Sequence, residues 1–275
     1  MARIRKRQWG LLLLGTVCTI FVFYSLQKRQ ANENNRHTIN GKNEIVFSAP
    51  QCQLSEEEIA ELPYTQWRDY LLRTLNADLN DTLLKYLPQE LSLDRAEKSK
   101  LLALDVGAGA GNVTRFLLKR DWAVTALDID AASIKIIENC AKKLGIDQSL
   151  KTVHSAVEKA NLPQKHFDLL HASLVFPFVP QKDFPQTWKK LASTLKPGAY
   201  FTGDFFGPKH EWRKKVDGSV DESMSFYTEE EVRKLMDEND LKIIDLENFF
   251  GERVLGSDRV KEFHRIRVVA QKETL

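Results

Sequence analysis

The sequence predicts an α/β fold: a doubly wound, mostly parallel sheet of seven strands with helices on both faces. Three observations predict it. From residue 101 onward, short apolar runs alternate with amphipathic stretches of helical spacing. A turn with three glycines joins the first apolar run to the first helix, and an acidic residue ends the second run. Units of this kind build parallel sheets that bind a ligand at the carboxyl ends of their strands.

Each element follows from the period of its apolar residues, which is two in a strand and about 3.6 in a helix. Strands are expected at residues 101–106, 122–128, 150–155, 167–172, 198–205, 241–248 and 263–270. Helices are expected at residues 112–120, 131–144, 183–195 and 228–239.

The turn after the first strand contains Gly107, Gly109 and Gly111, and Asp105 stands just before it. Glycine has no Cβ, so the backbone can turn sharply here and lie against a bound molecule. The G-x-G-x-x-G spacing of nicotinamide sites places a pyrophosphate on the helix N-terminus, whereas here Asn112 stands where the third glycine is expected. A carboxylate beside the turn favours a cation, such as a sulfonium nucleoside that carries an ammonium group.

A second acid ends the next strand. Asp128 lies about as far beyond the glycines as the acid that binds the ribose hydroxyls in nucleotide-binding βαβ units. We expect Asp128 to accept hydrogen bonds from both ribose hydroxyls and Ile129 to lie against the nucleobase. Asp130 is expected to cap the following helix.

In these two motifs the chain resembles class I S-adenosylmethionine-dependent methyltransferases, whose first motif is D/E-x-G-x-G-x-G and whose second strand ends in an acid. The resemblance extends from about Lys100 to the C-terminus: residues 166–172 resemble the family's fourth strand and residues 195–202 the entry to its fifth. Three aromatic motifs, at residues 205–212, 224–229 and 261–265, resemble small stand-alone members of the tellurite-resistance type. The resemblance implies a Rossmann-like sheet with an antiparallel edge and S-adenosyl-L-methionine as the cofactor.

The resemblance also implies roles for particular residues. The expected cofactor-binding residues are Asp105, Gly107, Ala108, Gly109, Gly111, Asp128, Ile129 and Glu158. Glu158 stands where the family has an acid near the adenine amine, and an exposed surface glutamate is the alternative. His171 ends the fourth strand, where substrate and cofactor meet, so it is the candidate to position or deprotonate the acceptor. A purely structural histidine is the alternative.

The segment from residue 205 to residue 227 is expected to select the acceptor. It follows the fifth strand, combines aromatic with polar side chains, and contains Gly207 and Gly218, where a lid could bend. The candidate substrate-binding residues are His210, Trp212 and Tyr227. The alternative is a surface connection whose aromatic residues cover the sheet edge. His264 is expected to be structural.

The composition limits the classes of partner that we expect this chain to bind. A chain of 275 residues with 43% hydrophobic residues can form one domain and an appendage. Its formal net charge of +2 lacks the basic surplus of a duplex-binding domain, so we expect a small-molecule partner and no nucleic acid. Cys18, Cys52 and Cys140 stand far apart without metal-ligand spacing, so neither a metal site nor a disulfide is predicted and Cys140 is expected to be a core thiol.

The N-terminus predicts a single membrane anchor over residues 1–30. Four basic residues precede an uncharged stretch at residues 9–26, which as a helix would just span a hydrocarbon core of about 30 Å. The alternatives are a cleaved secretory signal and a buried or mitochondrial targeting segment. Basic residues are slightly more numerous before the stretch than after it, which weakly favours a domain outside the cytoplasm. The side of the membrane therefore stays open.

Between the anchor and the sheet, residues 31–54 read as a polar tether and residues 55–95 as a helical cap; residues 96–275 form the methyltransferase domain in this interpretation. A capping box at Ser55 begins the cap. Its aromatic residues can face the cofactor or pack on the sheet; they are Tyr64, Trp67 and Tyr70.

The expected reaction is an in-line displacement that moves a methyl group from a sulfonium to a small-molecule acceptor, so alignment and exclusion of water can supply much of the catalysis. One alternative is a non-catalytic S-adenosylmethionine-binding membrane adaptor. Another is a nucleotide-binding oxidoreductase, which the glycine spacing disfavours.

Overall fold

The computed structural model describes residues 49–77, 79, 100–214, 219–221, 223–255 and 259–274, with the backbone alone at 252–255 and 259–261. The predicted anchor at residues 1–30, most of the tether and part of the cap therefore lie outside the described residues. Within the described ranges, no helix has both the length and the apolar character that crossing a membrane requires.

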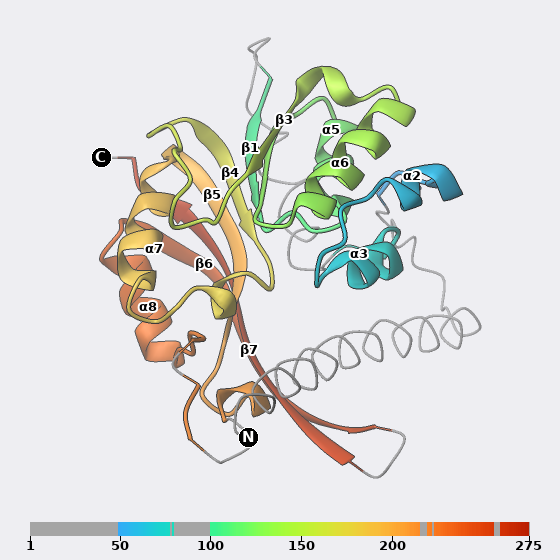
Figure 1. Cartoon of the computed structure of the whole chain (residues 1–275). Helices are drawn as coiled ribbons and strands as arrows, with labels where there is room; N and C mark the ends of the chain where they lie inside the picture. Colours follow the sequence, from blue (N-terminus) through green and yellow to red (C-terminus); the bar gives the residue numbers. More distant parts are fainter. Residues whose placement is uncertain are drawn as a thin grey trace, which may run out of the picture.

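A seven-stranded sheet forms the centre of the molecule (Figure 1). Its strands are β1 (Leu102–Val106), β2 (Ala123–Asp128), β3 (Leu150–His154), β4 (Phe167–Ala172), β5 (Leu195–Phe206), β6 (Leu241–Leu255) and β7 (Arg259–Lys272). The spatial order is β3-β2-β1-β4-β5-β7-β6. Strands β1 to β5 pair in parallel, and β7 pairs antiparallel with both β5 and β6. The mostly parallel sheet and its antiparallel edge are confirmed.

Helices cover both faces of this sheet (Figure 1). Helices α5 (Asn112–Leu118) and α6 (Ala131–Lys143) lie on one face, and α7 (Phe184–Ser193) and α8 (Glu229–Asp237) lie on the other. Two short helices, α2 (Glu56–Ala60) and α3 (Arg68–Thr74), lie beside α6. The predicted capping box is present, because Ser55 and Glu58 each accept a hydrogen bond from the other's backbone N–H.

The last two strands are longer than the sequence predicts. They pair with each other as far as Leu255 and Arg259, well beyond the point where β5 ends at Phe206. In this extension the strands form a two-stranded ladder whose backbone hydrogen bonds need no apolar alternation. The apolar period therefore ends before the strands do.

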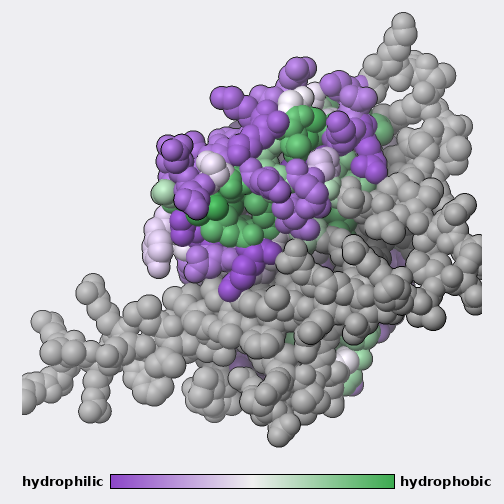
Figure 2. Space-filling view, turned by 90° about the vertical axis from the view of Figure 1, so that its right-hand side faces the viewer, coloured by the Kyte–Doolittle hydropathy of each residue, from purple (hydrophilic) through white to green (hydrophobic). Residues whose placement is uncertain are grey.

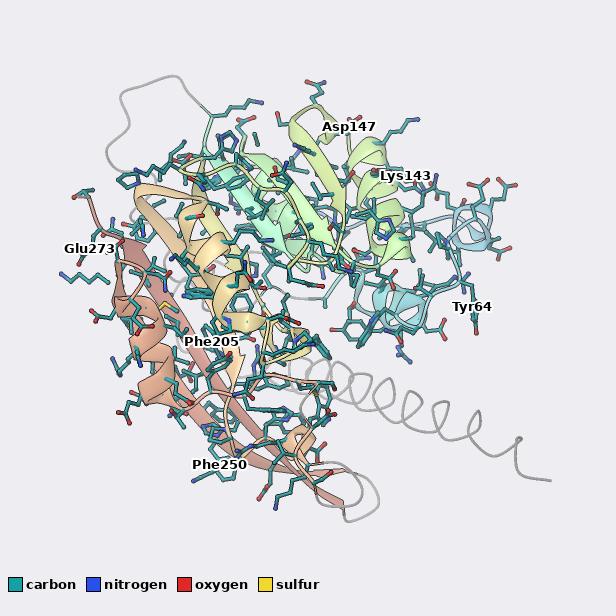
Figure 3. The ribbon with its side chains drawn as sticks, turned by 60° about the vertical axis from the view of Figure 1, so that its left-hand side comes forward. Tyr64, Lys143, Asp147, Phe205, Phe250 and Glu273 are labelled. Atoms are coloured by element: carbon teal, nitrogen blue, oxygen red, sulfur yellow. A yellow bond between two sulfur atoms is a disulfide. The ribbon has the colours of Figure 1, made fainter. Side chains whose placement is uncertain are left out.

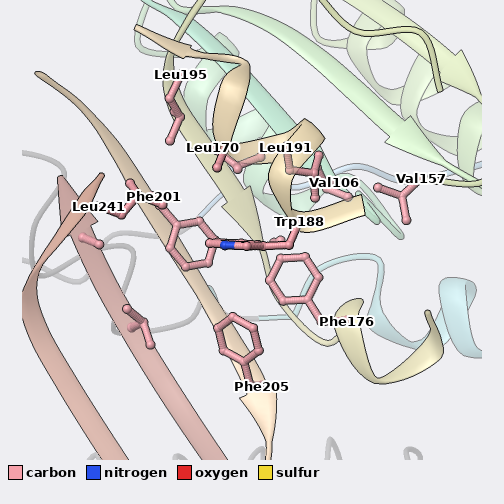
Figure 4. Close-up of a cluster of buried hydrophobic side chains, with 14 of the residues drawn as sticks. Val106, Val157, Leu170, Phe176, Trp188, Leu191, Leu195, Phe201, Phe205 and Leu241 are labelled. Carbon is pink, nitrogen blue, oxygen red and sulfur yellow. The ribbon is translucent and has the colours of Figure 1, made fainter. Parts of the chain in front are cut away.

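The largest hydrophobic cluster fills the space between the sheet and α7 and α8. Trp188 of α7 contacts Phe176, Phe201 and Phe205, all of which are fully buried (Figure 4). Each such side chain contributes about 1.5–3 kcal/mol through burial. This cluster fixes β4 and β5, whose carboxyl ends carry part of the candidate site.

A disulfide between Cys52 and Cys140 joins the segment before α2 to α6, with 5.6 Å between the two Cα atoms. The predictions of no disulfide and of a core thiol at Cys140 are therefore wrong. The two residues are 88 positions apart, and no local spacing pattern reveals that the segment folds back onto α6. Both sulfurs lie in an apolar cluster with Leu62, Leu71 and Ile136.

Polar contacts reinforce the same attachment. Lys143 of α6, labelled in Figure 3, forms an ion pair with Glu58 of α2 and donates to the carbonyl oxygen of Gln53 at 2.8 Å. The side-chain amide of Asn76 pairs with the backbone N–H and C=O of Cys52. On this side of the molecule, polar surface encloses smaller apolar patches (Figure 2).

Candidate cofactor and acceptor site

Four residues form a row near the carboxyl ends of adjacent strands. In the register of the sheet, Asp105 of β1 is paired with Ala126 of β2 and with His171 of β4, and His171 is paired with Thr202 of β5. The strand order reverses between β1 and β4, which is the switch point where α/β sheets bind ligands. Asp105 and His171 are thus brought together at that point.

The glycine turn has the predicted backbone. Gly107, Gly109 and Gly111 all have positive φ, at 62°, 55° and 73°. A Cβ on Gly107 would lie 2.2 Å from Cγ2 of Val175, and one on Gly111 would lie 2.7 Å from Cγ1 of Ile137. A Cβ on Gly109 would meet nothing closer than 3.8 Å. Packing within the chain therefore requires two of the glycines, whereas a Cβ on Gly109 would make only ordinary van der Waals contacts, with the carbonyl oxygen of Gly107 and Cδ2 of Leu71.

Asp128 lies at the end of β2 and is 9% exposed. Its Oδ2 accepts from the backbone N–H of Gly109 and its Oδ1 from that of Asp130, both at 2.8 Å. Each carboxylate oxygen can accept a second hydrogen bond. Burial raises the pKa of Asp128, and the two amides oppose that shift. The neighbouring Ile129 is 64% exposed.

The carboxyl group of Asp105 is buried and accepts a hydrogen bond from the Thr114 hydroxyl at 2.6 Å. Thr114 lies in the first turn of α5, so Asp105 ties the end of β1 to that helix. Burial, with a smaller contribution from the charge of Asp128, raises the pKa of Asp105 to about 7 against the opposing hydrogen bonds from Thr114. Near neutral pH this carboxyl is therefore close to half protonated.

His171 is 4% exposed, and its Nδ1 lies 2.9 Å from the hydroxyl oxygen of Thr202. Burial lowers the pKa of His171 to about 4, although the charge of Asp204 opposes the shift. At neutral pH the ring is therefore uncharged.

A buried arginine fastens the cap to the glycine turn. Arg115 of α5 donates to the carbonyl oxygen of Ala110 at 2.7 Å and to that of Pro50 at 3.0 Å. It also donates to the carbonyl oxygen of Leu75, just after α3. Burial lowers its pKa to about 10, which leaves it charged at neutral pH. One guanidinium thus connects the turn, the segment before α2 and the end of α3.

A row of aromatic side chains runs from the cap to the segment after β5. Phe178 lies between Trp67 and Trp212, with ring centroids 5.6 Å and 6.2 Å away. Trp212 also contacts Phe206, at 5.6 Å. Trp67 and Trp212 are half-buried and Phe178 is 40% exposed. We call Trp67, Phe178 and Trp212 the aromatic row.

The predicted substrate residues lie in different places. His210 stacks on Phe206 at 3.9 Å and its Nδ1 accepts from the backbone N–H of Trp212, so it supports the aromatic row from a buried position. Tyr227 contacts Phe184 and Phe205 in the large cluster, on the face of the sheet that α7 covers. Burial raises the pKa of its hydroxyl well above the usual range. The structure does not bring Tyr227 together with Trp212.

Three further residues are placed as follows. Glu158 is exposed, and its charge raises the pKa of Lys190 on α7 against the effect of burial. Asp130 accepts from the backbone N–H groups of Ala132 and Ser133, so its predicted role as the N-cap of α6 is confirmed. His264 is buried, and its ring nitrogens lie within hydrogen-bond distance of the Lys209 N–H and the Asn248 side chain. These contacts agree with the expected structural role of His264.

Sequence reasoning missed Arg115, Phe178 and Asp204. Arg115 carries no periodic signal beyond a charged residue on an otherwise apolar helix face, which is itself a sign of a buried ion or hydrogen-bond centre. Phe178 and Asp204 sit in apolar runs, where their contacts depend on elements far along the chain. Among the described residues, no cluster of three or more His, Cys, Asp or Glu side chains could hold a metal ion.

Residues 103–198 match the model of a family described as a methyltransferase domain. A malonyl-[acyl-carrier protein] O-methyltransferase of Acetivibrio thermocellus is 32% identical over 117 residues, which cover 42% of this chain and 39% of that protein. The chain thus spans about two fifths of the length of this curated relative.

Solved structures share the fold. A SAM-dependent methyltransferase from Methanosarcina mazei aligns with a TM-score of 0.52 at 19% identity, over 72% of this chain and 100% of that one. TehB from Haemophilus influenzae aligns with a TM-score of 0.56 at 16% identity, over 74% of this chain and 66% of that one. At such identities the likeness shows the fold alone.

Proposed function

We propose that this chain, whose residues 103–198 match a methyltransferase domain, is a class I S-adenosylmethionine-dependent enzyme that transfers a methyl group from S-adenosylmethionine to a small-molecule acceptor. One observation carries the proposal. At the end of β2, the strand next to the switch point, Asp128 accepts from the N–H of Gly109, where a Cβ would meet no atom closer than 3.8 Å, and the neighbouring Ile129 is exposed. Asp128 can accept hydrogen bonds from ribose hydroxyls, the glycine turn lets a ligand lie along its backbone, and Ile129 can cover an adenine.

S-adenosylmethionine supplies a methyl group on a positively charged sulfur. The chain's residues have to align the acceptor with that methyl group and exclude water, because an in-line displacement depends mainly on these two conditions. Asp128 and Ile129 would hold the nucleoside. Asp105, close to half protonated in the free protein, would gain negative charge beside a bound ammonium group.

The aromatic row would form the wall against which the acceptor lies. Trp67 comes from the cap and Trp212 from the segment after β5, so an acceptor at Phe178 would be enclosed from both sides. His171 was predicted to position or deprotonate the acceptor. Its burial, its low pKa and its contact with Thr202 support positioning over proton transfer.

The same proposal includes a membrane anchor at residues 1–30 and a location of the domain outside the cytoplasm. The disulfide between Cys52 and Cys140 supports an oxidising compartment for the domain, because such bridges are rare where glutathione keeps thiols reduced. The positive-inside bias of the N-terminus agrees with this side. Thiol labelling of protein isolated from its host, with and without prior reduction, tests the location. Free Cys52 and Cys140 before reduction would refute it.

The test of the activity has two stages. Calorimetric titration of the full chain with S-adenosylmethionine and S-adenosylhomocysteine tests binding, and methyl-labelled S-adenosylmethionine then screens small thiols, amines, carboxylates and metalloid oxyanions. Binding with turnover of at least one acceptor supports the proposal. Binding without turnover across the screen would favour the non-catalytic membrane adaptor, and absence of binding would refute both.

A further inference from the structure

The carboxylate of Asp204 joins three segments at the carboxyl end of β5. It is fully buried, with 0% exposure. Its Oδ2 accepts from the hydroxyl of Ser173 at 2.8 Å and forms an ion pair with Arg265 of β7. Its Oδ1 accepts from the backbone N–H of Leu174 at 3.0 Å. Asp204 therefore ties β5 and β7 to the segment that follows β4.

That segment, residues 173–178, reaches both halves of the candidate site. Cγ2 of Val175 fills the space where a Cβ on Gly107 would lie, so Val175 lies directly behind the glycine turn. Phe178, at the end of η2 (Phe176–Phe178), is the middle member of the aromatic row. A shift of this segment would move the back of the cofactor turn and the centre of the acceptor wall together.

The backbone of the segment needs an external restraint. Leu174 has φ of +59°, a left-handed conformation that a residue with a Cβ rarely adopts. Such a conformation persists only where the surrounding structure over-determines it. Asp204 supplies two hydrogen bonds at Ser173 and Leu174, and Ser225 holds the other end by donating to the carbonyl oxygens of Pro177 and Val179.

We propose that Asp204, neutralised by Arg265, is a positioning residue for methyl transfer: it holds residues 173–178 so that Val175 supports the glycine turn and Phe178 completes the acceptor wall. This inference rests on the proposed function. Asp204 is buried and accepts hydrogen bonds from Ser173 and Leu174, so we expect its effect to reach the ligands through the segment, beside the rise that its charge causes in the pKa of His171. The charge pair with Arg265 is what allows a carboxylate to remain buried there.

The chain offers a matched control. Asp168 of β4 is also buried, forms an ion pair with Lys196 at 2.9 Å and accepts from the backbone N–H of Leu102 at 2.9 Å. It lies near the amino end of its strand, away from the carboxyl edge that carries the site. Asp204→Asn and Asp168→Asn therefore remove the same charge from two similar pairs, and only the first touches residues 173–178.

Three measurements compare these variants in the full chain: hydrogen exchange of peptides that cover residues 173–178, calorimetric affinity for S-adenosylmethionine, and kcat and KM for an acceptor found in the screen. In Asp204→Asn we expect exchange of the segment and the acceptor KM each to rise at least about tenfold, since small misplacements of a bound reactant have large kinetic effects. The affinity for S-adenosylmethionine should fall by a smaller factor, because Asp128 holds the nucleoside independently. Asp168→Asn should change none of the three.

If Asp204→Asn does not fold, Ser173→Ala replaces it, because that change removes one hydrogen bond and leaves the charge pair; its effects should have the same direction and be smaller. Equal changes in the three measurements for Asp204→Asn and Asp168→Asn would overturn the inference. If wild-type protein binds no S-adenosylmethionine, the proposed function fails on its own account. Hydrogen exchange then still decides whether Asp204 holds residues 173–178.

Discussion

Asp105 and Asp128 are two buried carboxylates at the same edge of the sheet, and their surroundings give them different chemistry. Asp128 accepts two backbone N–H groups, which favour its charged form against burial. Asp105 accepts from Thr114, and burial dominates its pKa. We expect the first to bind neutral hydroxyl donors and the second to respond to the charge of a ligand.

Asp105 should make stability depend on pH. Its folded pKa of about 7 lies above the ordinary carboxyl value of 3.8, so the folded state binds more protons between these values. Its contribution to stability is therefore fully present below about pH 4 and is lost as the pH rises towards 7. Asp105→Asn removes the titration. The variant should gain stability relative to wild type across this window, by an amount on the order of a few kcal/mol. Urea unfolding at a series of pH values measures this difference in the free energy of unfolding. A difference between variant and wild type that stays the same at every pH would contradict the assignment.

Asp128→Ala should weaken S-adenosylmethionine binding while the fold persists. Each charge-assisted hydrogen bond to a ribose hydroxyl contributes about 1.5–3 kcal/mol, so the dissociation constant should rise at least about tenfold. Asp130→Ala is the control, because it removes the N-cap of α6 and should cost about 1 kcal/mol of stability with little change in affinity. Calorimetry and unfolding of both variants distinguish the roles. Unchanged affinity in folded Asp128→Ala would remove this residue from the site.

At the scale of elements, the glycine turn contains two glycines that packing within the chain requires and one, Gly109, that it does not. Gly107 and Gly111 pack against Val175 and Ile137, so their substitution would disturb the fold itself. Gly109 donates its N–H to Asp128, and a Cβ there would meet Cδ2 of Leu71 and the carbonyl oxygen of Gly107 only at ordinary contact distance. Only at Gly109 can binding be tested without a clash.

Gly109→Ala should fold and lose affinity for S-adenosylmethionine. Its positive φ makes a side chain cost about 1–2 kcal/mol, and the added methyl group would narrow the space between the turn and Leu71, where we expect the ligand to approach. Gly145→Ala is a matched control: Gly145 also has positive φ, at 63°, and a Cβ there would meet nothing within 4 Å. Both variants should lose similar stability, and only Gly109→Ala should lose binding. Equal affinities in calorimetry would show that the ligand does not approach Gly109.

Much of the element structure could be predicted because its causes are local. The apolar period located the strands and helices, and the capping box at Ser55 and the N-cap at Asp130 depend on residues within three positions. The extension of β6 and β7 could not be predicted, since pairing between two strands leaves no apolar period where no core lies behind them.

At the scale of the whole molecule, the cap is attached by contacts that no local sequence pattern predicts. The disulfide, Arg115 and Asn76 each join residues that are 24 or more positions apart. The same holds for Asp204 and Arg265, which are 61 positions apart. The site's acids and glycines were predictable as a local motif, whereas the partners that hold them depend on which distant segments the fold brings together.

Replacing both Cys52 and Cys140 by Ala should destabilise the chain. The bridge closes a loop of 88 residues, and cross-links of this length lower the entropy of the unfolded state enough to contribute about 4 kcal/mol. Hydrogen exchange should also rise over residues 49–77, because this segment loses its covalent attachment to α6. Urea unfolding with and without a reductant measures the effect. Identical midpoints for oxidised wild type and the double variant would contradict it.

The aromatic row also gives the protein an optical signal. Of the tryptophans that the structure describes, Trp122 and Trp188 are buried in hydrophobic clusters, whereas Trp67 and Trp212 are half-buried on either side of Phe178. A molecule that enters beside Phe178 would displace water from these two indoles alone and shift their emission to shorter wavelength. The candidate acceptors could therefore be ranked by titration in a fluorimeter, without label and before any turnover is seen.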